Sequence, residues 1–280
     1  MTIDALEGPP STTAGTRRIL AVASVLVFLV GIQLFVLTEA TDRFFAWTIG
    51  SPLTAAFLGA AYWASFAMEL AASRQRAWSH ARIAVPAVLV FTAATFVVTL
   101  IHLELFHLDD PRVLTRFLTW GWLVVYAVVP PLMLLILVRQ VRAAAPDRPR
   151  RRPTPAWFRV LLSVHAVGMV PLGVALLVDP VGVASIWPWP LTPLTGRAVG
   201  AWSLGLGIAA AHAVWENDWS RIGAATASYL VFGVLELVAI ARYPSELAWD
   251  TAGAWVYLGF LLSAALAGGY GWWHAHRVAV

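Results

Sequence analysis

Long apolar segments alternate with short polar segments along the whole chain. Each apolar segment has about 20 residues, the length that an α-helix needs to cross the hydrocarbon core of a bilayer. Continuous apolar runs of this length exclude the alternating pattern of a membrane β-barrel. The sequence therefore predicts an all-α, polytopic transmembrane helix bundle with about eight spans. The expected spans are residues 19–37, 52–72, 83–105, 118–138, 156–178, 198–215, 222–241 and 251–273.

Composition supports this class, because 60% of the residues are apolar and 12% are charged. Soluble proteins average about half and a quarter. All the basic residues are arginine, a bias typical of a GC-rich bacterial genome, and we predict no nucleic-acid binding. Without lysine, no cofactor is held as a Schiff base. Without cysteine, thiolate metal sites and disulfides are excluded.

The arginines favour one orientation. Arg17 and Arg18 precede the first apolar run, which we expect to be an uncleaved span, and residues 1–18 form an N-terminal tail. With this tail in the cytoplasm, most arginines fall on the cytoplasmic side, as the positive-inside rule requires. Only Arg43, Arg112, Arg116, Arg197 and Arg242 fall outside. We predict a multi-pass protein of the bacterial inner (plasma) membrane with both termini in the cytoplasm.

Tryptophans cluster near the ends of the predicted spans. Indole favours the headgroup region of a bilayer, so we expect these residues to anchor the helices at the interface. They are Trp47, Trp78, Trp120, Trp122, Trp157, Trp187, Trp189, Trp215, Trp219, Trp249, Trp255, Trp272 and Trp273.

The chain has the pattern of a duplication. An Arg- and Pro-rich cytoplasmic linker, residues 143–155, separates a first four-span repeat, residues 19–142, from a second, residues 156–280. Short motifs recur in the same order: Pro52-Leu53-Thr54 and Gly59-Ala60 match Pro193-Leu194-Thr195 and Gly200-Ala201, and Arg82-Ile83 matches Arg221-Ile222. With an even number of spans, both repeats enter the bilayer in the same direction and are parallel.

Small residues at every fourth position bring helices close together in lipid. The sixth and eighth spans carry such faces, which predicts that both lie at the centre of the bundle. The faces are Ala201, Gly205, Ala209 and Ala213 in the sixth span, and Gly259, Ser263, Ala267 and Gly271 in the eighth.

Ionisable residues inside the bilayer are costly and are therefore functional candidates. Glu236 lies about 21 Å from the cytoplasmic end of its span. Tyr229 and Tyr243 share its helix face, which favours a proton or substrate path. The alternative is a neutral or paired carboxyl that joins neighbouring helices.

A second group follows the third span. Glu104, His107 and Asp110 are spaced three apart and are expected to share a helix face at the outer surface, where they could exchange protons or bind a cation. A solvated acidic helix end is the alternative, and we predict no dedicated metal site. Glu69 and Glu216, which close their spans, are expected to pair with nearby arginines.

His165 and His212 lie at similar depths on adjacent spans. Facing histidines could ligate haem, but a hydrogen bond between helices explains them as well. We therefore predict no cofactor.

Arg197 is the leading candidate for a binding site. It follows a proline-rich outer loop that we expect to be rigid and extended, and it lies in the first turn of a helix that Thr195 would cap. A positive charge is unfavourable there, so an acidic partner or a bound anion is expected. Asp179, Glu236, Glu104 and a lipid phosphate are the candidates.

Three functions fit these features. The first is a small transporter or permeation protein, with a cavity between the repeats lined by Glu236, Tyr229, Thr95 and Thr99 and with Arg197 at its outer mouth. The second is an enzyme acting on a lipid or lipid-linked substrate, with Glu104, His107, Asp109, Asp110 and Arg197 gathered outside. The third is a scaffold subunit. A midplane cavity indicates the first, an outer acidic cluster the second, and neither feature the third.

Overall fold

The computed structural model describes residues 11–142, 147 and 149–279. In these residues the chain forms eight helices long and apolar enough to span a membrane, which confirms the all-α polytopic bundle. They are α1 (Ala14–Gly31), continued by a π-helix (Ile32–Val36), α3 (Pro52–Ser73), α5 (Ala84–Ile101), α6 (Val113–Arg142), α7 (Ala156–Val178), α9 (Pro193–Glu216), α10 (Gly223–Arg242) and α11 (Ala252–Ala279). The connections carry α2 (Thr41–Phe44), α4 (Trp78–Ala81), α8 (Pro180–Ala184) and single 3₁₀ turns at Thr38–Ala40, Leu103–Leu105 and Pro244–Glu246.

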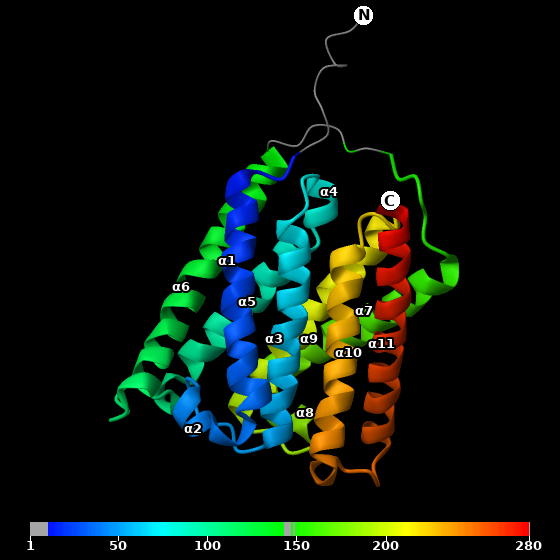
Figure 1. The fold of residues 1–280 in the computed structure, drawn as a ribbon. Helices are drawn as coiled ribbons and strands as arrows, with labels where there is room; N and C mark the ends of the chain where they lie inside the picture. The colour runs from blue at the N-terminus through cyan, green and yellow to red at the C-terminus, as the bar shows by residue number, and fades with distance from the viewer. Residues whose placement is uncertain (1–10, 143–146, 148, 280) are drawn as a thin grey trace, which may run out of the picture.

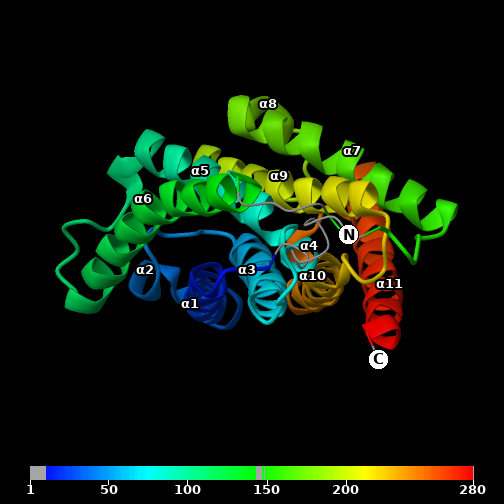
Figure 2. The same ribbon diagram turned by 90° about the horizontal axis from the view of Figure 1, so that it is seen from above.

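The eight long helices form two layers (Figure 2). Side by side, one layer holds α1, α3, α10 and α11, and the other holds α6, α5, α9 and α7. Helices α3 and α9 are the most enclosed, with 72% and 67% of their apolar windows buried, against 33% for both α7 and α11. The core therefore lies around α3 and α9, while α7 and α11 lie opposite each other at one end of the layers.

Two faces close the bundle. Helix α1 begins and α11 ends at the same face, which we call the terminal face (Figure 1). The opposite face, with α2 and α8, is the loop face. Helices α6 and α7 also end and begin at the terminal face, so each run of four long helices returns to the side from which it started.

Prolines and hydroxyl caps define the starts of α3 and α9. Ser51 and Thr192 accept hydrogen bonds from the backbone N–H groups of Thr54 and Thr195, at 3.0 and 3.2 Å, and each is followed by a proline whose missing N–H costs nothing there. Thr192 and Thr195 form a capping box. The prediction that Thr195 caps this helix was therefore wrong by three residues.

Two other predicted boundaries also differ. Thr13 caps α1, which begins at Ala14, so residues 14–18 are helical and not part of a tail. The third span ends at Ile101 because the chain turns into the 3₁₀ segment Leu103–Leu105. The expected linker, residues 143–155, lies partly outside the described residues. In its described part, Asp147 binds Arg82 and Arg221, and Arg150 donates to the carbonyl oxygen of Glu216 at the end of α9.

Glycines bring helix backbones into direct contact. A Cβ added to Gly59 on α3 would lie 2.4 Å from the backbone nitrogen of Phe35. A Cβ added to Gly200 on α9 would lie 2.9 Å from the carbonyl oxygen of Gly173 on α7. Such contacts allow close van der Waals packing, which drives helix association in lipid. The pairs α1–α3 and α7–α9 are thus joined in the same way.

The small-residue faces give a mixed result. Helix α9 is central, as predicted, but α11 is at the end of its layer, so the prediction for the eighth span was wrong. Ala267 and Gly271 of α11 pack against α10 and its neighbours, whereas Gly259 has open space beside it. The fourth-residue pattern therefore identifies a helix that makes close contacts without fixing its place in the bundle.

The tryptophan prediction was also wrong in part. Seven of the expected interface anchors are well exposed: Trp120, Trp157, Trp215, Trp249, Trp255, Trp272 and Trp273. Five others are at most 7% exposed and form core instead: Trp47, Trp78, Trp122, Trp189 and Trp219. Except for Trp78, their rings contact other aromatic side chains, as Trp122 does with Phe45 edge to face and with Tyr126 in a tilted arrangement. Proximity to a span end does not tell whether a side chain points to lipid or to a neighbouring helix.

We predict that Gly59→Ala and Gly200→Ala each destabilise the protein by about 1–3 kcal/mol, the usual cost of overpacking. Backbone atoms block the new methyl group, so it cannot be accommodated by a rotamer change. Gly121→Ala on α6 is the matched control, because a Cβ there meets nothing within 4 Å. Thermal unfolding in one detergent measures the three effects. A loss of stability in Gly121→Ala equal to the other two would contradict this packing account.

Candidate functional site

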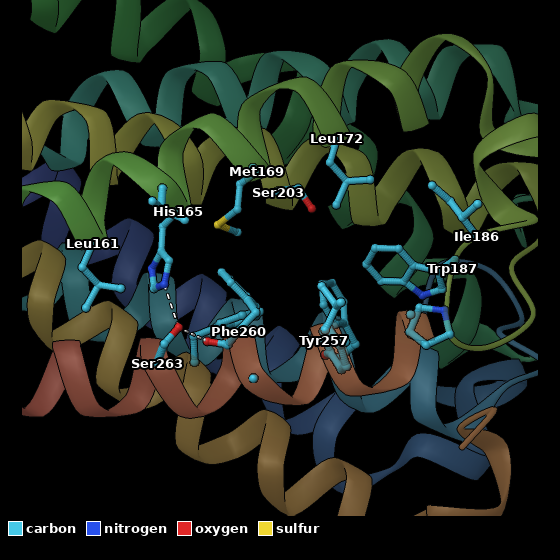
Figure 3. A pocket seen from close by; sticks show the side chains of 18 residues that line it. Leu161, His165, Met169, Leu172, Ile186, Trp187, Ser203, Tyr257, Phe260 and Ser263 are labelled. Atoms are coloured by element: carbon cyan, nitrogen blue, oxygen red, sulfur yellow. Dashed lines mark hydrogen bonds between the residues drawn. The ribbon is translucent and has the colours of Figure 1, made fainter. Parts of the chain in front are cut away.

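A cavity of about 590 Å³ lies between α7 and α11, the two helices at the open end of the layers (Figure 3). Its walls are almost entirely apolar and rich in aromatic side chains, among them Phe57, Phe232, Phe260 and Tyr257, with Met169 beside them. Ile186, Trp187 and Pro188 close the cavity toward the loop face. Leu161, His165 and Ser263 line its opposite end, toward the terminal face. Its volume is in the range typical of small-molecule sites.

The cavity opens sideways, toward the region where lipid surrounds the bundle. Val164 on α7 and Val256 on α11 line it and are 61% and 72% exposed. Gly168 and Gly259 also line it, and a Cβ added to either would meet nothing within 4 Å. A molecule dissolved in the bilayer can therefore reach the cavity between the two helices without crossing a polar surface.

Most polar side chains of the cavity are already engaged. Ser263 donates its hydroxyl proton to the carbonyl oxygen of Phe260, at 2.8 Å, and lies 2.8 Å from His165 Nε2. Because a serine hydroxyl has one proton, Nε2 of His165 must be the donor in that second bond. Tyr257 donates to Glu236 Oε2 at 2.9 Å.

The Ser203 hydroxyl, in contrast to those of Ser263 and Tyr257, is not engaged in a hydrogen bond within the described residues. Ser203 is on α9 in the back wall, it is 4% exposed, and its hydroxyl points into the cavity (Figure 3). Ser203 is ten residues from the start of α9, or about 15 Å, which places it near the middle of a hydrocarbon core of roughly 30 Å.

Glu236 and Tyr229 lie on α10 behind this cavity. Glu236 is fully buried, and it contacts the cavity only through the Tyr257 hydroxyl. Tyr229 donates to the carbonyl oxygen of Leu206 at 3.2 Å, and its ring stacks on His165 at 5.5 Å. The hydroxyl of Tyr243, predicted on the same face, is hydrogen-bonded to Thr38. The residues of this face thus join α10 to α9, α7, α11 and the segment after α1.

The space between the two predicted repeats is closely packed. A void of about 10 Å³ lies there, lined by Ser65, Phe91, Trp202, Ser228 and their neighbours. Thr95 and Thr99 are buried on α5, where Thr99 bonds the Thr95 carbonyl oxygen. The large cavity is instead lateral, and of the residues expected to line a cavity none lines this one.

Arg197 makes neutral contacts. Its Nε donates to the carbonyl oxygen of Leu177 at 3.1 Å, and Nη1 donates to His102 Nε2 at 2.8 Å. Among the described residues, no acidic side chain pairs with Arg197, so the candidates Asp179, Glu236 and Glu104 were wrong, while a lipid phosphate or another anion stays a prediction. Instead of a carboxylate, Arg197 binds the carbonyl oxygen of Leu177, which lies in the last turn of α7. Arg242 binds the Phe35 carbonyl oxygen beside α1 in a similar way.

The outer acidic group does not assemble as predicted. Because α5 ends at Ile101, Glu104 and His107 do not share a helix face. The His107 ring lies 3.0 Å from the Thr48 hydroxyl and 3.1 Å from the Phe45 carbonyl oxygen. No group of three or more potential metal ligands is found in the described part of the chain.

Asp110 is held in its charged form. Arg112 donates to both of its carboxylate oxygens, at 3.0 and 2.9 Å, and this lowers the pKa of Asp110 to about 2. A carboxyl with this pKa carries no proton at neutral pH and is unsuited to general acid catalysis. Glu104 is exposed.

The two histidines of the haem alternative point to different partners. His165 binds Ser263 on α11, whereas His212 lies 3.4 Å from Glu216 on its own helix. Glu216 also pairs with Arg221 at 3.2 Å, as expected, and with Arg82. The expected arginine partner of Glu69 is not seen in the described residues; Glu69 Oε1 accepts from the Ser65 hydroxyl at 2.7 Å, and Oε2 has no partner there.

Sequence reasoning therefore missed the main elements of the cavity, Gly168, Ser203 and Tyr257. Three lining residues did stand out in the sequence: Gly259 and Ser263 were assigned to close helix packing, and His165 to haem or a hydrogen bond between helices. A glycine and a serine in an apolar helix have several explanations, and only the three-dimensional arrangement separates them.

Comparison of this chain with known protein families, with curated proteins and with solved structures finds no match. The fold and the cavity together define the class: a polytopic helical membrane protein with a lateral apolar cavity.

The contact between Arg197 and His102 predicts a pH effect. Burial and the charge of Arg197 lower the pKa of His102, so the folded protein favours the neutral imidazole. The unfolded chain, with a histidine pKa of about 6.5, takes up the proton first. Stability is therefore complete above that value and falls as the pH drops below it.

We expect the melting temperature to fall between about pH 7.5 and pH 5.5, and to fall less in His102→Gln, which does not titrate. Tryptophan fluorescence during heating measures both slopes. Equal slopes in the two proteins would show that His102 does not contribute to the pH dependence.

Proposed function

We propose that the protein takes up a lipid-soluble molecule from the bilayer through the opening between α7 and α11 and acts as a small carrier for it. The observation that supports this function is the 590 Å³ apolar cavity with an opening bordered by Gly168 and Gly259. Burial of apolar surface is favourable wherever the cavity would otherwise hold water or poorly packed lipid.

The lining favours an uncharged ligand. None of the side chains that line the cavity is Asp, Glu or Arg. A charged ligand would lose its hydration without a compensating ion pair, which is costly. A water-soluble substrate would also need a polar route from one face, whereas the side opening is flanked by Val164 and Val256.

The other two functions receive less support. An enzyme of the outer surface needs acid and base groups within reach of each other, but Asp110 is neutralised by Arg112 and Arg197 is bonded to His102. A scaffold subunit needs no cavity. A carrier needs a binding site near the middle of the membrane, and Ser203 lies at that depth in the cavity wall.

We place the terminal face in the cytoplasm and the protein in a bacterial plasma membrane. The arginines support this orientation, because Arg74, Arg142, Arg159, Arg221 and Arg277 all occur at helix ends of the terminal face.

We also propose that the chain is a duplicated four-span unit. Backbone contacts at corresponding positions support this origin. His107 N–H donates to the Ala46 carbonyl oxygen at 3.0 Å, and Ala248 N–H donates to the Pro188 carbonyl oxygen at 2.8 Å; the two donors are 141 residues apart and the two acceptors 142. The α1–α3 pair resembles α7–α9, α5–α6 resembles α10–α11, and each layer takes one pair from each half.

Photolabelling tests the carrier function. The probe is 3-trifluoromethyl-3-(m-iodophenyl)diazirine, a lipid-soluble molecule without a carbonyl group, added to the protein in lipid nanodiscs. We expect saturable labelling of cavity residues such as Met169 and Phe260, above that of the lipid-facing residue Phe117. The double variant Gly168→Leu, Gly259→Leu should lower it about tenfold, the effect of losing ~1.4 kcal/mol of binding free energy.

Gly121→Leu is the matched control, because Gly121 also has open space beside it and lies on α6, away from the cavity. Its cavity labelling should equal that of the unsubstituted protein. Labelling of Met169 that is no higher than that of Phe117, or that does not saturate, would refute the proposed binding site.

A further inference from the structure

The Ser203 hydroxyl is a buried hydrogen-bonding group in an otherwise apolar wall. It is 4% exposed, and no partner for it is found within the described chain. An unpaired buried hydroxyl costs about 1–3 kcal/mol, so a partner from the ligand would recover that cost. Among the neighbouring polar groups, Ser263 is committed to Phe260 and His165, and Tyr257 to Glu236. Trp187 Nε1 and His165 Nδ1 also have no partner within the described residues, but both atoms are fully buried and not accessible from the cavity.

We propose that the ligand is a planar, aromatic carbonyl compound of the quinone type, with its carbonyl oxygen bound by the Ser203 hydroxyl. This inference rests on the proposed function and adds the chemical class of the ligand. A carbonyl oxygen is satisfied by one donor, and Ser203 supplies one donor.

The shape of the site favours a planar ring. Phe57, Phe232, Phe260 and Trp187 present aromatic surfaces to the cavity, and aromatic rings pack well by offset stacking or edge-to-face contact. Met169 adds a polarisable sulfur that adapts to aromatic edges. A saturated chain would gain apolar burial from these walls but no benefit from the aromatic geometry.

The depth of Ser203 separates this ligand from an ordinary membrane lipid. A phospholipid keeps its polar group at the headgroup region, whereas Ser203 lies about 15 Å from the start of α9. A molecule that uses this hydroxyl carries its carbonyl group near the bilayer midplane. Lipid-soluble aromatic carbonyl compounds can do so because they have no charge and no large hydrated headgroup.

Competition against the photoprobe tests the proposal. The competitors are 2-methyl-3-decyl-1,4-naphthoquinone and 2-methyl-3-decylnaphthalene, which share one skeleton and differ in the carbonyl groups. Concentrations are expressed per mole of lipid. In the unsubstituted protein the quinone should displace the probe at about a fivefold lower concentration than the hydrocarbon, the effect of one net hydrogen bond. In Ser203→Ala the two competitors should be equal.

Ser228→Ala is the control, since Ser228 is also buried and unpartnered within the described residues but lies outside this cavity. It should keep the fivefold preference, and the melting temperatures of both variants show whether each is folded. Equal competition by both compounds in the unsubstituted protein would overturn the carbonyl assignment and leave the proposed function intact. A preference that persists in Ser203→Ala would also overturn it. If cavity labelling saturates but neither compound displaces the probe, the carbonyl assignment is overturned, whereas the absence of saturable cavity labelling would refute the proposed function itself.

Discussion

Close backbone contact between helices is the constraint on which this structure depends. In lipid there is no hydrophobic force between helices, so they associate where small side chains allow dense packing. Gly59 fixes α3 against the end of α1, Gly200 fixes α9 against α7, and Gly268 fixes α11 against α10. These contacts account for three of the helix pairs within the layers, α1–α3, α7–α9 and α10–α11. Between α7 and α11 no glycine meets the backbone of the other helix in the described chain; Gly271 meets the Phe158 ring near the terminal face, and the cavity lies farther along the two helices.

Polar interactions hold the two faces of the bundle and leave the cavity apolar. On the terminal face, Glu216 binds Arg82 and Arg221, and Asp147 of the linker binds the same two arginines. Such pairs satisfy charges that would be costly if left alone. On the loop face, Arg197 and Arg242 bind carbonyl oxygens at the ends of α7 and α1. The middle of the bundle is free of such networks where α7 and α11 diverge.

The sequence predicted the fold class and the approximate spans because hydropathy reports directly on length in the bilayer. It also predicted the pair between Glu216 and Arg221, which are five residues apart. It did not predict helix neighbours, because in this composition both the lipid-facing and the protein-facing sides of a helix are apolar. For that reason Trp47 and Trp122 were assigned to the interface although they form core. Glu104 and His107 were assigned to one helix face because the end of α5 has no strong breaker in the sequence.

The candidate site was hard to predict for the same reason. Gly168, Ser203 and Tyr257 are on three different helices and are ordinary residues for a membrane span. Their common role depends on the divergence of α7 from α11, which is a property of the whole bundle. Glu236, the deepest acidic residue that the sequence predicted, does not line the cavity. It accepts a hydrogen bond from Tyr257, which does.

The most direct test of the central claim is the accessibility of the cavity wall to oxygen and to a water-soluble nickel complex. The chain has no cysteine, so Ser203→Cys gives a single position for a nitroxide label, and electron paramagnetic resonance in nanodiscs measures its collisions with both reagents. A cavity open to lipid predicts a high collision rate with oxygen and a low rate with nickel. A high rate with nickel would indicate a water-filled path, and low rates with both would indicate a closed core. Either result would contradict a lateral opening between α7 and α11.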